Sequence, residues 1–324
     1  MKKSLSKIWK IGLTLLFGLV VFLFWRFRYP FALAYQEQLQ LFLFDDDYFW
    51  KRLSEPGGLA RYIAEFLVQF YNIVTIGALI IALLLMTVQR LTWRLMQRRV
   101  HYALSFIPAK MLWFAMGDEN VMLTYAVALV LALVAVLVLN KCLPQKKYIR
   151  LFILLLILPL LYWLIGPLAL LVAVCVMPVS AVWVLAVMLL SAHYLPYPML
   201  RVMFGIGYYR IPITTSYWLM VIPAVVALAY WVHRLAKNMK TSPRVEVVLA
   251  VVMVVLAVLL VPRHYNAKTY ELIEYDYLVR VGDWNAVIVK AEKQMPDLPM
   301  SVSATNLALG MTNQLGERAF DFYQ

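Results

Sequence analysis

The sequence predicts an all-α protein: a polytopic transmembrane helix bundle of about eight or nine spans, followed by a short helical-hairpin segment. The chain is 64% hydrophobic and has a mean hydropathy of +0.77. Several apolar runs approach or exceed the ~20 residues that cross a bilayer as a helix. Charged residues make up only 15% of the chain and gather between these runs. Lipid therefore replaces much of the core that a soluble chain of this length would need.

The positive charge is arranged in four clusters, at residues 1–10, 90–99, 141–150 and 234–244. Each cluster holds four Lys or Arg and no Asp or Glu. Cytoplasmic loops of membrane proteins are enriched in Lys and Arg, so we expect these four segments on the cytoplasmic side. The net charge of +13 could suggest a nucleic-acid partner, but such a surface would not need membrane spans between its basic clusters. We therefore expect the lipid bilayer, and no nucleic acid, as a partner.

The first predicted span is Ile8–Trp25, running outward from a cytoplasmic N-terminus. A cleaved secretory signal is disfavoured because a long, charged stretch separates this run from the small residues around Ala34. Residues 26–65 form an external loop that is rich in aromatic side chains and is expected to lie on the membrane surface. Its last part, from Leu59, should be helical and continue directly into the second span, Phe66–Val88.

Seven further crossings complete the prediction. The third span, Tyr102–Met116, is short and contains Pro108. The uncharged residues 151–190 supply two spans hinged at Gly166–Pro167. The remaining confident spans are Val121–Leu139, Tyr217–Trp231 and Val247–Val261. An even number of spans must separate the basic clusters at 141–150 and 234–244, so residues 194–209 are predicted to supply a ninth crossing.

The chain divides into a transmembrane domain, residues 1–262, and a soluble helical segment, residues 263–324. This topology predicts a bacterial inner-membrane protein with a periplasmic C-terminal segment. The pair Gly282-Asp283 is followed 34 residues later by Gly316-Glu317, which is the period of tetratricopeptide repeats. An ordinary helical tail with two similar turns is the alternative. Such repeats need about three units for stability, so we expect the chain to be a fragment of a longer protein. The alternative is that the tail packs on the membrane domain or on a partner.

No motif of a soluble enzyme is present, and neither a zinc site nor any other metal site is expected. The sequence names no cofactor. The candidate catalytic residues are carboxylates of the external loop: Glu37, Asp45 and Asp47. A structural explanation exists for Asp45–Asp47, because aspartate caps helix starts and a helix is expected near Tyr48. Glu37 lacks that explanation.

Cations within the membrane layer supply the candidate ligands for a phosphate: Lys110, Arg201 and Arg210. A mid-span lysine must face a polar interior or water, and arginine holds phosphate through paired donors. Snorkelling of Lys110 and headgroup contacts of both arginines are the alternatives.

Two resemblances follow from these residues. The stretch from Arg28 to Phe42, together with Pro56-Gly57-Gly58-Leu59-Ala60 and the tail around Gly282-Asp283-Trp284, resembles an uncharacterised family of Bacteroidetes multi-pass membrane proteins. The layout is also similar to the GT-C glycosyltransferases, which implies polyprenyl-phosphate-linked sugar donors. It further implies a catalytic carboxylate in the first external loop, for which Glu37 or one of Asp45–Asp47 would serve as base or cation ligand. Lys110 or Arg201 would bind the carrier phosphate.

The sequence therefore leaves two functions open. The first is a GT-C-like glycosyltransferase of the cell envelope that uses a polyprenyl-phosphate carrier. The second is a non-catalytic membrane scaffold whose repeat-like tail binds partner proteins. The enzyme requires its external carboxylates to meet Lys110 or Arg201 around one cavity. The sequence does not distinguish the sugar, the acceptor or the oligomeric state.

Overall fold

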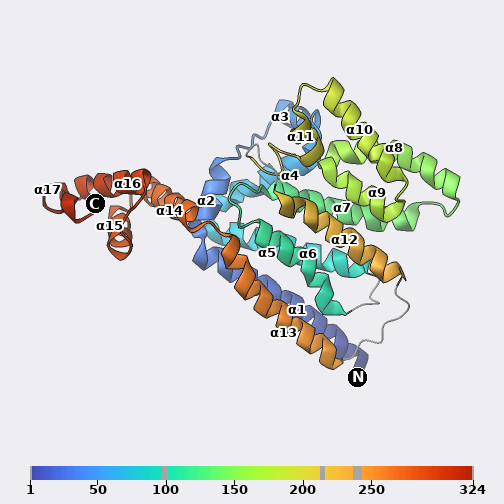
Figure 1. Cartoon of the computed structure of the whole chain (residues 1–324), viewed down its shortest axis with the longest axis horizontal. Helices are drawn as coiled ribbons and strands as arrows, with labels where there is room; N and C mark the ends of the chain where they lie inside the picture. Colours follow the sequence, from blue (N-terminus) through green and yellow to red (C-terminus); the bar gives the residue numbers. More distant parts are fainter. Residues whose placement is uncertain (1, 97–100, 212–215, 236–242, 323–324) are drawn as a thin grey trace.

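A computed structural model describes residues 2–96, 101–211, 216–235 and 243–322, and this part is helical throughout, with no β-strand beyond isolated bridges (Figure 1). The N-terminal half contains α1 (Lys2–Leu23), η1 (Phe24–Arg28), α2 (Pro30–Gln38), α3 (Asp46–Leu53), α4 (Gly58–Val68), η2 (Gln69–Asn72), α5 (Val74–Leu95), η3 (Tyr102–Phe106), α6 (Ile107–Ala115) and α7 (Leu123–Cys142). The rest of the helical bundle contains α8 (Lys147–Ile165), η4 (Gly166–Leu168), α9 (Ala169–Val176), α10 (Ser180–Tyr194), α11 (Met199–Phe204), α12 (Tyr217–Leu235), α13 (Pro243–Leu260) and η5 (Val261–His264). The tail contains α14 (Ala267–Val281), α15 (Trp284–Lys293), α16 (Pro299–Met311), α17 (Leu315–Arg318) and η6 (Ala319–Asp321).

Five stretches are long and apolar enough to cross a membrane, and a sixth is added if the bent pair of α13 and α14 counts as one span. The five are Ile8–Arg28, Val74–Leu95, Leu123–Cys142, Lys147–Val176 and Tyr217–Arg234. Long apolar helices of this kind are compatible with a membrane protein. The expected count of eight or nine spans is not reached because α6, α10 and α11, which fall in predicted crossings, have only 9, 15 and 6 residues. At ~1.5 Å per residue they are shorter than the ~30 Å hydrocarbon core.

Two predictions about individual elements need correction. The helix from Leu59 does not continue into the second span: α4 ends at Val68, and Ile73 is extended before α5 begins. Residues 194–209 do not form a crossing, because α11 has six residues and the chain turns at Gly205. Residues 151–190 break at Gly166, as predicted. They also break a second time, between α9 and α10, and this second break was not predicted.

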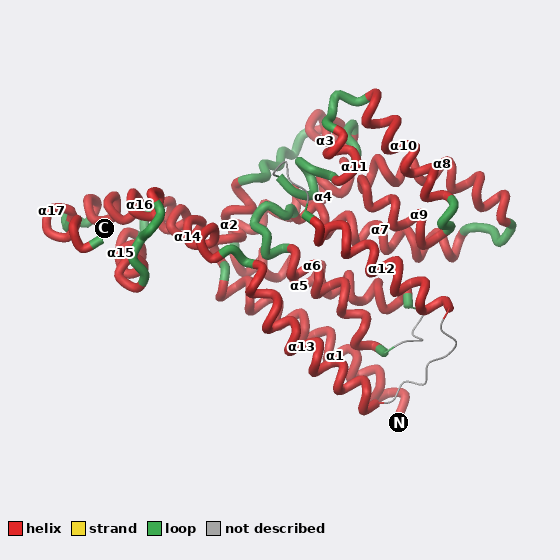
Figure 2. Tube along the Cα trace, in the orientation of Figure 1, coloured by secondary structure: helices red, strands yellow, loops and turns green. Residues whose placement is uncertain are grey.

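The helices run between two chemically different ends. At one end, called here the basic end, α5, α7 and α12 finish close to the start of α8, and the side chains of Arg94, Arg150 and Arg234 line one pocket. At the other, the acidic end, loops and short helices gather around α3, α4 and α11 (Figure 2). The predicted grouping of basic residues at one end therefore holds for these described arginines.

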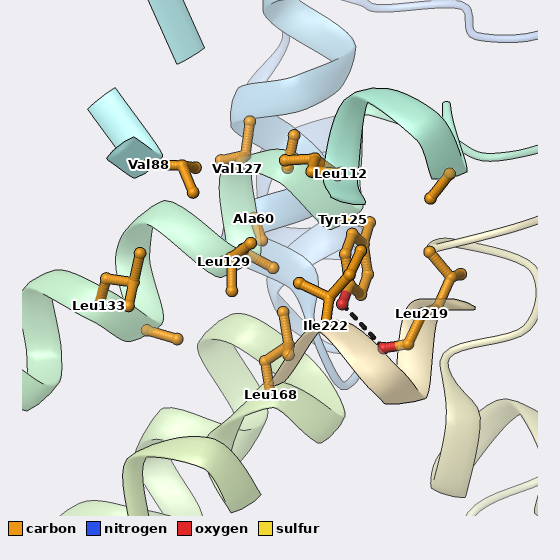
Figure 3. Packing of buried hydrophobic residues seen from close by; sticks show 14 of the residues in the cluster. Ala60, Val88, Leu112, Tyr125, Val127, Leu129, Leu133, Leu168, Leu219 and Ile222 are labelled. Atoms are coloured by element: carbon orange, nitrogen blue, oxygen red, sulfur yellow. Dashed lines mark hydrogen bonds between the residues drawn. The ribbon is translucent and has the colours of Figure 1, made fainter. Parts of the chain in front are cut away.

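The core is centred on α7, which is the most buried of the five candidate spans: 61% of its most apolar stretch is buried, against 28–44% for the others. Figure 3 shows Leu129 and Leu133 of α7 among buried side chains from other helices, and the Tyr125 hydroxyl donating to the Leu219 carbonyl, 2.8 Å away. The N-terminal helix α1 is fixed by a buried polar contact: Thr14 donates to Gln89 on α5. A fully internal hydrogen bond of this kind specifies which faces pack together.

The tail projects from the acidic end and has a hydrophobic cluster of its own (Figure 1). This cluster includes Tyr275, Val287 and Leu309, from three different helices. Gly282 takes the left-handed conformation that ends α14, as a turn glycine should. Gly316 lies inside α17 instead, and the left-handed residue before that helix is Asn313. The two glycine–acid pairs are therefore not equivalent in structure, and a tetratricopeptide repeat remains a prediction.

An aromatic cluster joins the tail to the helical bundle formed by the preceding helices. Tyr265, at the bend between α13 and α14, stacks on Tyr29 with ring centroids 4.6 Å apart, and Tyr270 contacts both rings. Phe24 and Trp25, at the end of the first span, also contact Tyr265. Such pairs stabilise by about 0.5–1.5 kcal/mol each beyond their buried area, so the start of the tail is held firmly against α2.

Glu271 on α14 gives the tail a pH-dependent stability. Its side chain is buried, its Oε1 has no hydrogen-bond partner in the described part of the chain, and burial raises the pKa of its carboxyl. A raised folded-state pKa favours the protonated form, so the associated stability is present below about pH 4.3 and is lost as the pH rises through the raised pKa. Hydrogen exchange of residues 267–311 should show Glu271→Gln to be more protected than the wild type at pH 7. The difference should disappear at pH 4; equal protection at both pH values would contradict this.

Candidate functional site

A chain of five charged residues connects three elements at the acidic end. Glu65 on α4 accepts from Arg52 Nε and Arg61 Nε, each at 2.8 Å, and from the Tyr48 hydroxyl. Glu55 accepts from Arg61 at 3.1 Å and from Arg201 on α11 at 2.5 Å. The carboxylates are largely shielded from solvent, with side-chain exposures of 4% for Glu65 and 14% for Glu55. Ion pairs at this depth fix geometry, because removing either partner leaves an uncompensated charge.

Two consecutive glycines allow the loop that carries Glu55 to pack tightly. Gly57 has φ +77°, and a side chain there would meet the Tyr208 ring; a Cβ on Gly58 would lie 2.0 Å from the Arg52 carbonyl oxygen. Two hydrogen bonds join the turn to Trp163 on α8. Gly57 N donates to the Trp163 carbonyl, and the Trp163 indole donates to the Leu53 carbonyl. The Pro56-Gly57-Gly58 motif therefore sets the place of Glu55 relative to Arg201.

The segment after α11 brings a second ion pair to the same end. Gly205 ends α11 in the left-handed conformation, and the Tyr209 carbonyl then accepts from Met122 N at 2.9 Å. This contact places Arg210 beside the turn before α7, where Arg210 Nε donates to Asp118 Oδ2 at 2.6 Å. Gln36 on α2 reaches the same turn and donates to the Glu119 carbonyl at 2.6 Å. The Asp118 turn is thus held from two sides.

A pocket of about 570 Å³ lies beneath α11. Its wall is mostly apolar and comes from α7, α9, α10, α11 and α12, including Leu171, Met203 and Leu219. Among the described residues lining it, Arg210 is the only one with a charged side chain. The phenols of Tyr125 and Tyr209 also line the pocket, but both donate to backbone carbonyls, of Leu219 and Ile165. A large apolar cavity with one guanidinium at its edge fits an apolar chain that ends in an anion.

The sequence-predicted site residues fall in different surroundings. Arg201 and Arg210 lie at the acidic end, and each is paired with a carboxylate that the sequence did not select. Lys110 is on α6 and lines a separate apolar pocket of about 130 Å³ between α1 and α13. The structure therefore brings Arg201 and Arg210 to one end and places Lys110 elsewhere.

The predicted carboxylates are not paired with these cations in the described part of the chain. Asp45, Asp46 and Asp47 are exposed. Asp45 occupies the N-cap position of α3, as its alternative explanation expected, although its side chain makes no capping hydrogen bond. Glu37 is half-buried on α2, and its sequence neighbour Gln36 donates to the Glu119 carbonyl in the Asp118 turn.

The carboxylates that sequence reasoning did not select are Glu55, Glu65 and Asp118. The (i, i+4) spacing of Arg61 and Glu65 on a helix is a usable signal for one pair. No local pattern indicates that Glu55 meets Arg201, because the two are separated by 146 positions.

Two phenols beside the ion pairs act as neutral donors. Burial, together with the hydrogen bond to the Glu65 carboxylate, raises the pKa of Tyr48 to about 12. Burial and the nearby Glu55 carboxylate raise the pKa of Tyr197, whose ring lies 4.3 Å from the Arg201 guanidinium carbon. Both hydroxyls therefore stay protonated at neutral pH. In the described part of the chain, no group of three His, Cys, Asp or Glu side chains could hold a metal ion.

The chain belongs to the Family of unknown function (DUF6057), whose model matches residues 6–324. The predicted resemblance to an uncharacterised family along the whole chain is confirmed at this level. Neither a curated protein nor a solved structure matches the chain.

Proposed function

We propose that the chain is a multi-pass protein of the bacterial inner membrane that binds a polyprenyl-phosphate carrier in the pocket beneath α11. It then acts in envelope assembly as a GT-C-like glycosyltransferase on the sugar that the carrier holds. The observation behind this proposal is the apolar pocket of about 570 Å³ with Arg210 as its charged lining residue. An isoprenoid chain is apolar throughout and its phosphate is anionic, so the two ends of such a ligand match the two kinds of wall.

The reaction also needs a carboxylate near the carrier phosphate. In glycosyl transfer the acceptor oxygen bonds to the anomeric carbon, the bond to the phosphate oxygen breaks and the carrier leaves with the bonding pair. A carboxylate takes the acceptor's proton. The predicted meeting of Glu37 or Asp45–Asp47 with Lys110 or Arg201 is not found among the described residues. We therefore assign this role to Asp118, whose Oδ2 lies 2.6 Å from Arg210 Nε. Glu37 is the second candidate, because Gln36 beside it contacts the same turn. Asp45 and Asp47 are less suited because they are exposed on α3.

The test separates binding from chemistry. Binding of fluorescent undecaprenyl phosphate to the purified chain in detergent should weaken by about tenfold or more in Arg210→Gln, since a charge-assisted hydrogen bond contributes roughly 1.5–3 kcal/mol. Asp118→Asn should bind the carrier within about threefold of wild type, yet lower sugar transfer from a mixture of polyprenyl-phosphate sugars by about 100-fold or more. Arg28→Gln is the control, an exposed arginine at the same end. Unchanged carrier binding by folded Arg210→Gln would reject the pocket as the carrier site.

The scaffold function remains a second candidate because the tail presents apolar side chains away from its own cluster. Leu307, Met311 and Phe320 are 47%, 58% and 86% exposed. If partner binding by the tail is the function, Leu307→Ser and Phe320→Ser should abolish complementation of a deletion strain, while Asp118→Asn and Arg210→Gln should restore growth as well as wild type does. The opposite pattern would favour the enzyme.

A further inference from the structure

We propose that the basic end holds a second anion site, separate from the pocket beneath α11, which takes a phosphate group. Three arginines from three different helices, Arg94 of α5, Arg150 of α8 and Arg234 of α12, line one pocket of about 330 Å³. Asn140, Gln145 and Tyr230 complete the polar part of the wall. Its location at the opposite end of the bundle makes this site independent of the proposed transferase activity.

Arg150 is the residue of this site whose side chain is fixed in position by the protein. Its terminal NH2 group donates to Asn140 Oδ1 at 2.8 Å and to the Val176 carbonyl at 3.1 Å, so the guanidinium is held in a fixed position. Its Nε is buried and has no hydrogen-bond partner in the described part of the chain. A buried donor without an acceptor costs about 1–3 kcal/mol, and a phosphate oxygen would remove that cost.

The other two arginines add charge at the opening of the pocket. Arg234 Nη1 donates to the Tyr230 hydroxyl at 3.2 Å, and the Arg234 guanidinium carbon lies 5.4 Å from the centre of the Trp231 ring. Arg94 is in the last turn of α5 and is exposed. Neither forms an ion pair with a carboxylate in the described residues.

No acidic residue is among the described residues that line this pocket. The sequence contains no Asp or Glu at residues 66–117 or 120–245, and every lining residue comes from these two stretches. Three guanidiniums around one cavity repel each other, and the repulsion is stronger at the edge of a membrane domain than in bulk water. An anion that enters the pocket therefore gains attraction from all three.

The charge rule for membrane topology does not explain this arrangement by itself. That rule requires cations to flank the spans, but it does not require them to converge on one cavity or to be fixed by backbone and amide acceptors. Guanidinium groups match phosphate because their paired donors fit two oxygens, and basic pockets between membrane helices bind phosphate headgroups. The phosphate could belong to an anionic lipid or to a soluble phosphate compound, and the experiment must separate these sources.

The experiment uses the full chain in neutral detergent and follows its thermal unfolding. One arm adds dioleoylphosphatidylglycerol, with dioleoylphosphatidylcholine as its reference. The other adds inorganic pyrophosphate, with sodium chloride at equal ionic strength as its reference. We expect one of the two probes to raise the Tm by several degrees above its reference. In the double variant Arg94→Gln/Arg234→Gln, the concentration of that probe that gives half of the Tm shift should be about tenfold or more higher than for the wild type.

Arg90→Gln is the matched control, because Arg90 lies on the same helix and does not line the pocket. It should leave the half-saturating concentration within about twofold. A response to phosphatidylglycerol that the double variant weakens supports the site with a lipid as source, and the same pattern with pyrophosphate supports a soluble source. No response of the wild type to either probe, or equal weakening in Arg90→Gln, overturns the proposal. If the double variant fails to fold, Arg94→Gln alone, at an exposed lining position, takes its place.

Discussion

Replacing Glu65 with alanine should lower the free energy of unfolding by about 3–5 kcal/mol, the usual cost of removing one partner from a buried ion pair. The Glu65 side chain is 4% exposed and accepts from Arg52 and Arg61 at 2.8 Å. Without it, the two guanidiniums face each other in a shielded space with Glu55 as the only remaining carboxylate of the five-residue chain. The Tyr48 hydroxyl would also lose its acceptor on Glu65.

Thermal unfolding of the purified chain in detergent, followed by tryptophan fluorescence, measures this effect. Asp46→Ala is the control, because it also removes one carboxylate at the acidic end but from an exposed position. We expect that control to change the stability by less than about 0.5 kcal/mol. A loss below about 1 kcal/mol in Glu65→Ala would mean that the five charges do not act as a buried network.

Replacing Gly58 with alanine should cost about 3 kcal/mol, because the added Cβ would lie 2.0 Å from the Arg52 carbonyl oxygen. That oxygen is backbone and cannot move aside like a flexible side chain. The α3–α4 turn would have to open, which would displace Arg52 from Glu65 and Glu55 from Arg201. We therefore expect a lower Tm together with faster hydrogen exchange in residues 46–68.

Gly12→Ala provides the comparison, since a Cβ at Gly12 meets nothing within 4 Å. Alanine in place of glycine inside a helix stabilises by roughly 0.5–1 kcal/mol, so this variant should unfold at the wild-type temperature or slightly above it. Wild-type exchange rates throughout residues 46–68 in Gly58→Ala would show that the turn tolerates a side chain.

The parts of the fold that follow from local pattern were predictable. Unbroken apolar runs such as Leu123–Cys142 were found within a few residues of their ends, and Gly166 was identified as a hinge. The C-terminal turn at Gly282 was also predicted. Each of these features depends on neighbours in sequence: the hydropathy of one helix, or the backbone freedom of one glycine.

The number of crossings could not be obtained in the same way. Residues 151–190 are uniformly apolar, so hydropathy gives no reason to divide them again between Val176 and Ser180. Charge parity asked for one more crossing between the basic clusters at 141–150 and 234–244, but it could not say where. The prediction therefore assigned that crossing to residues 194–209, which fold as the short helix α11 and the turn that follows.

The candidate site could be predicted only in part, because its ion pairs join segments that are far apart in the sequence. Arg201 and Arg210 were selected as cations at membrane depth, and both lie at the acidic end. Their partners, Glu55 and Asp118, are located by the tight packing of Gly57 on Tyr208 and by the contact of Met122 with Tyr209. Neither contact can be predicted from the spacing of residues or from the composition of the sequence.

The bend at Tyr265 determines the direction in which the tail leaves the helical bundle, and hence its distance from the membrane surface. Helices α13 and α14 meet at 70°, so if α13 stands upright in the bilayer, α14 runs closer to the plane of the membrane than to its normal. Its 15 residues span roughly 22 Å in that direction. In that orientation the tail extends beside the protein along the headgroup layer, so a partner of the tail would have to meet it at the membrane surface.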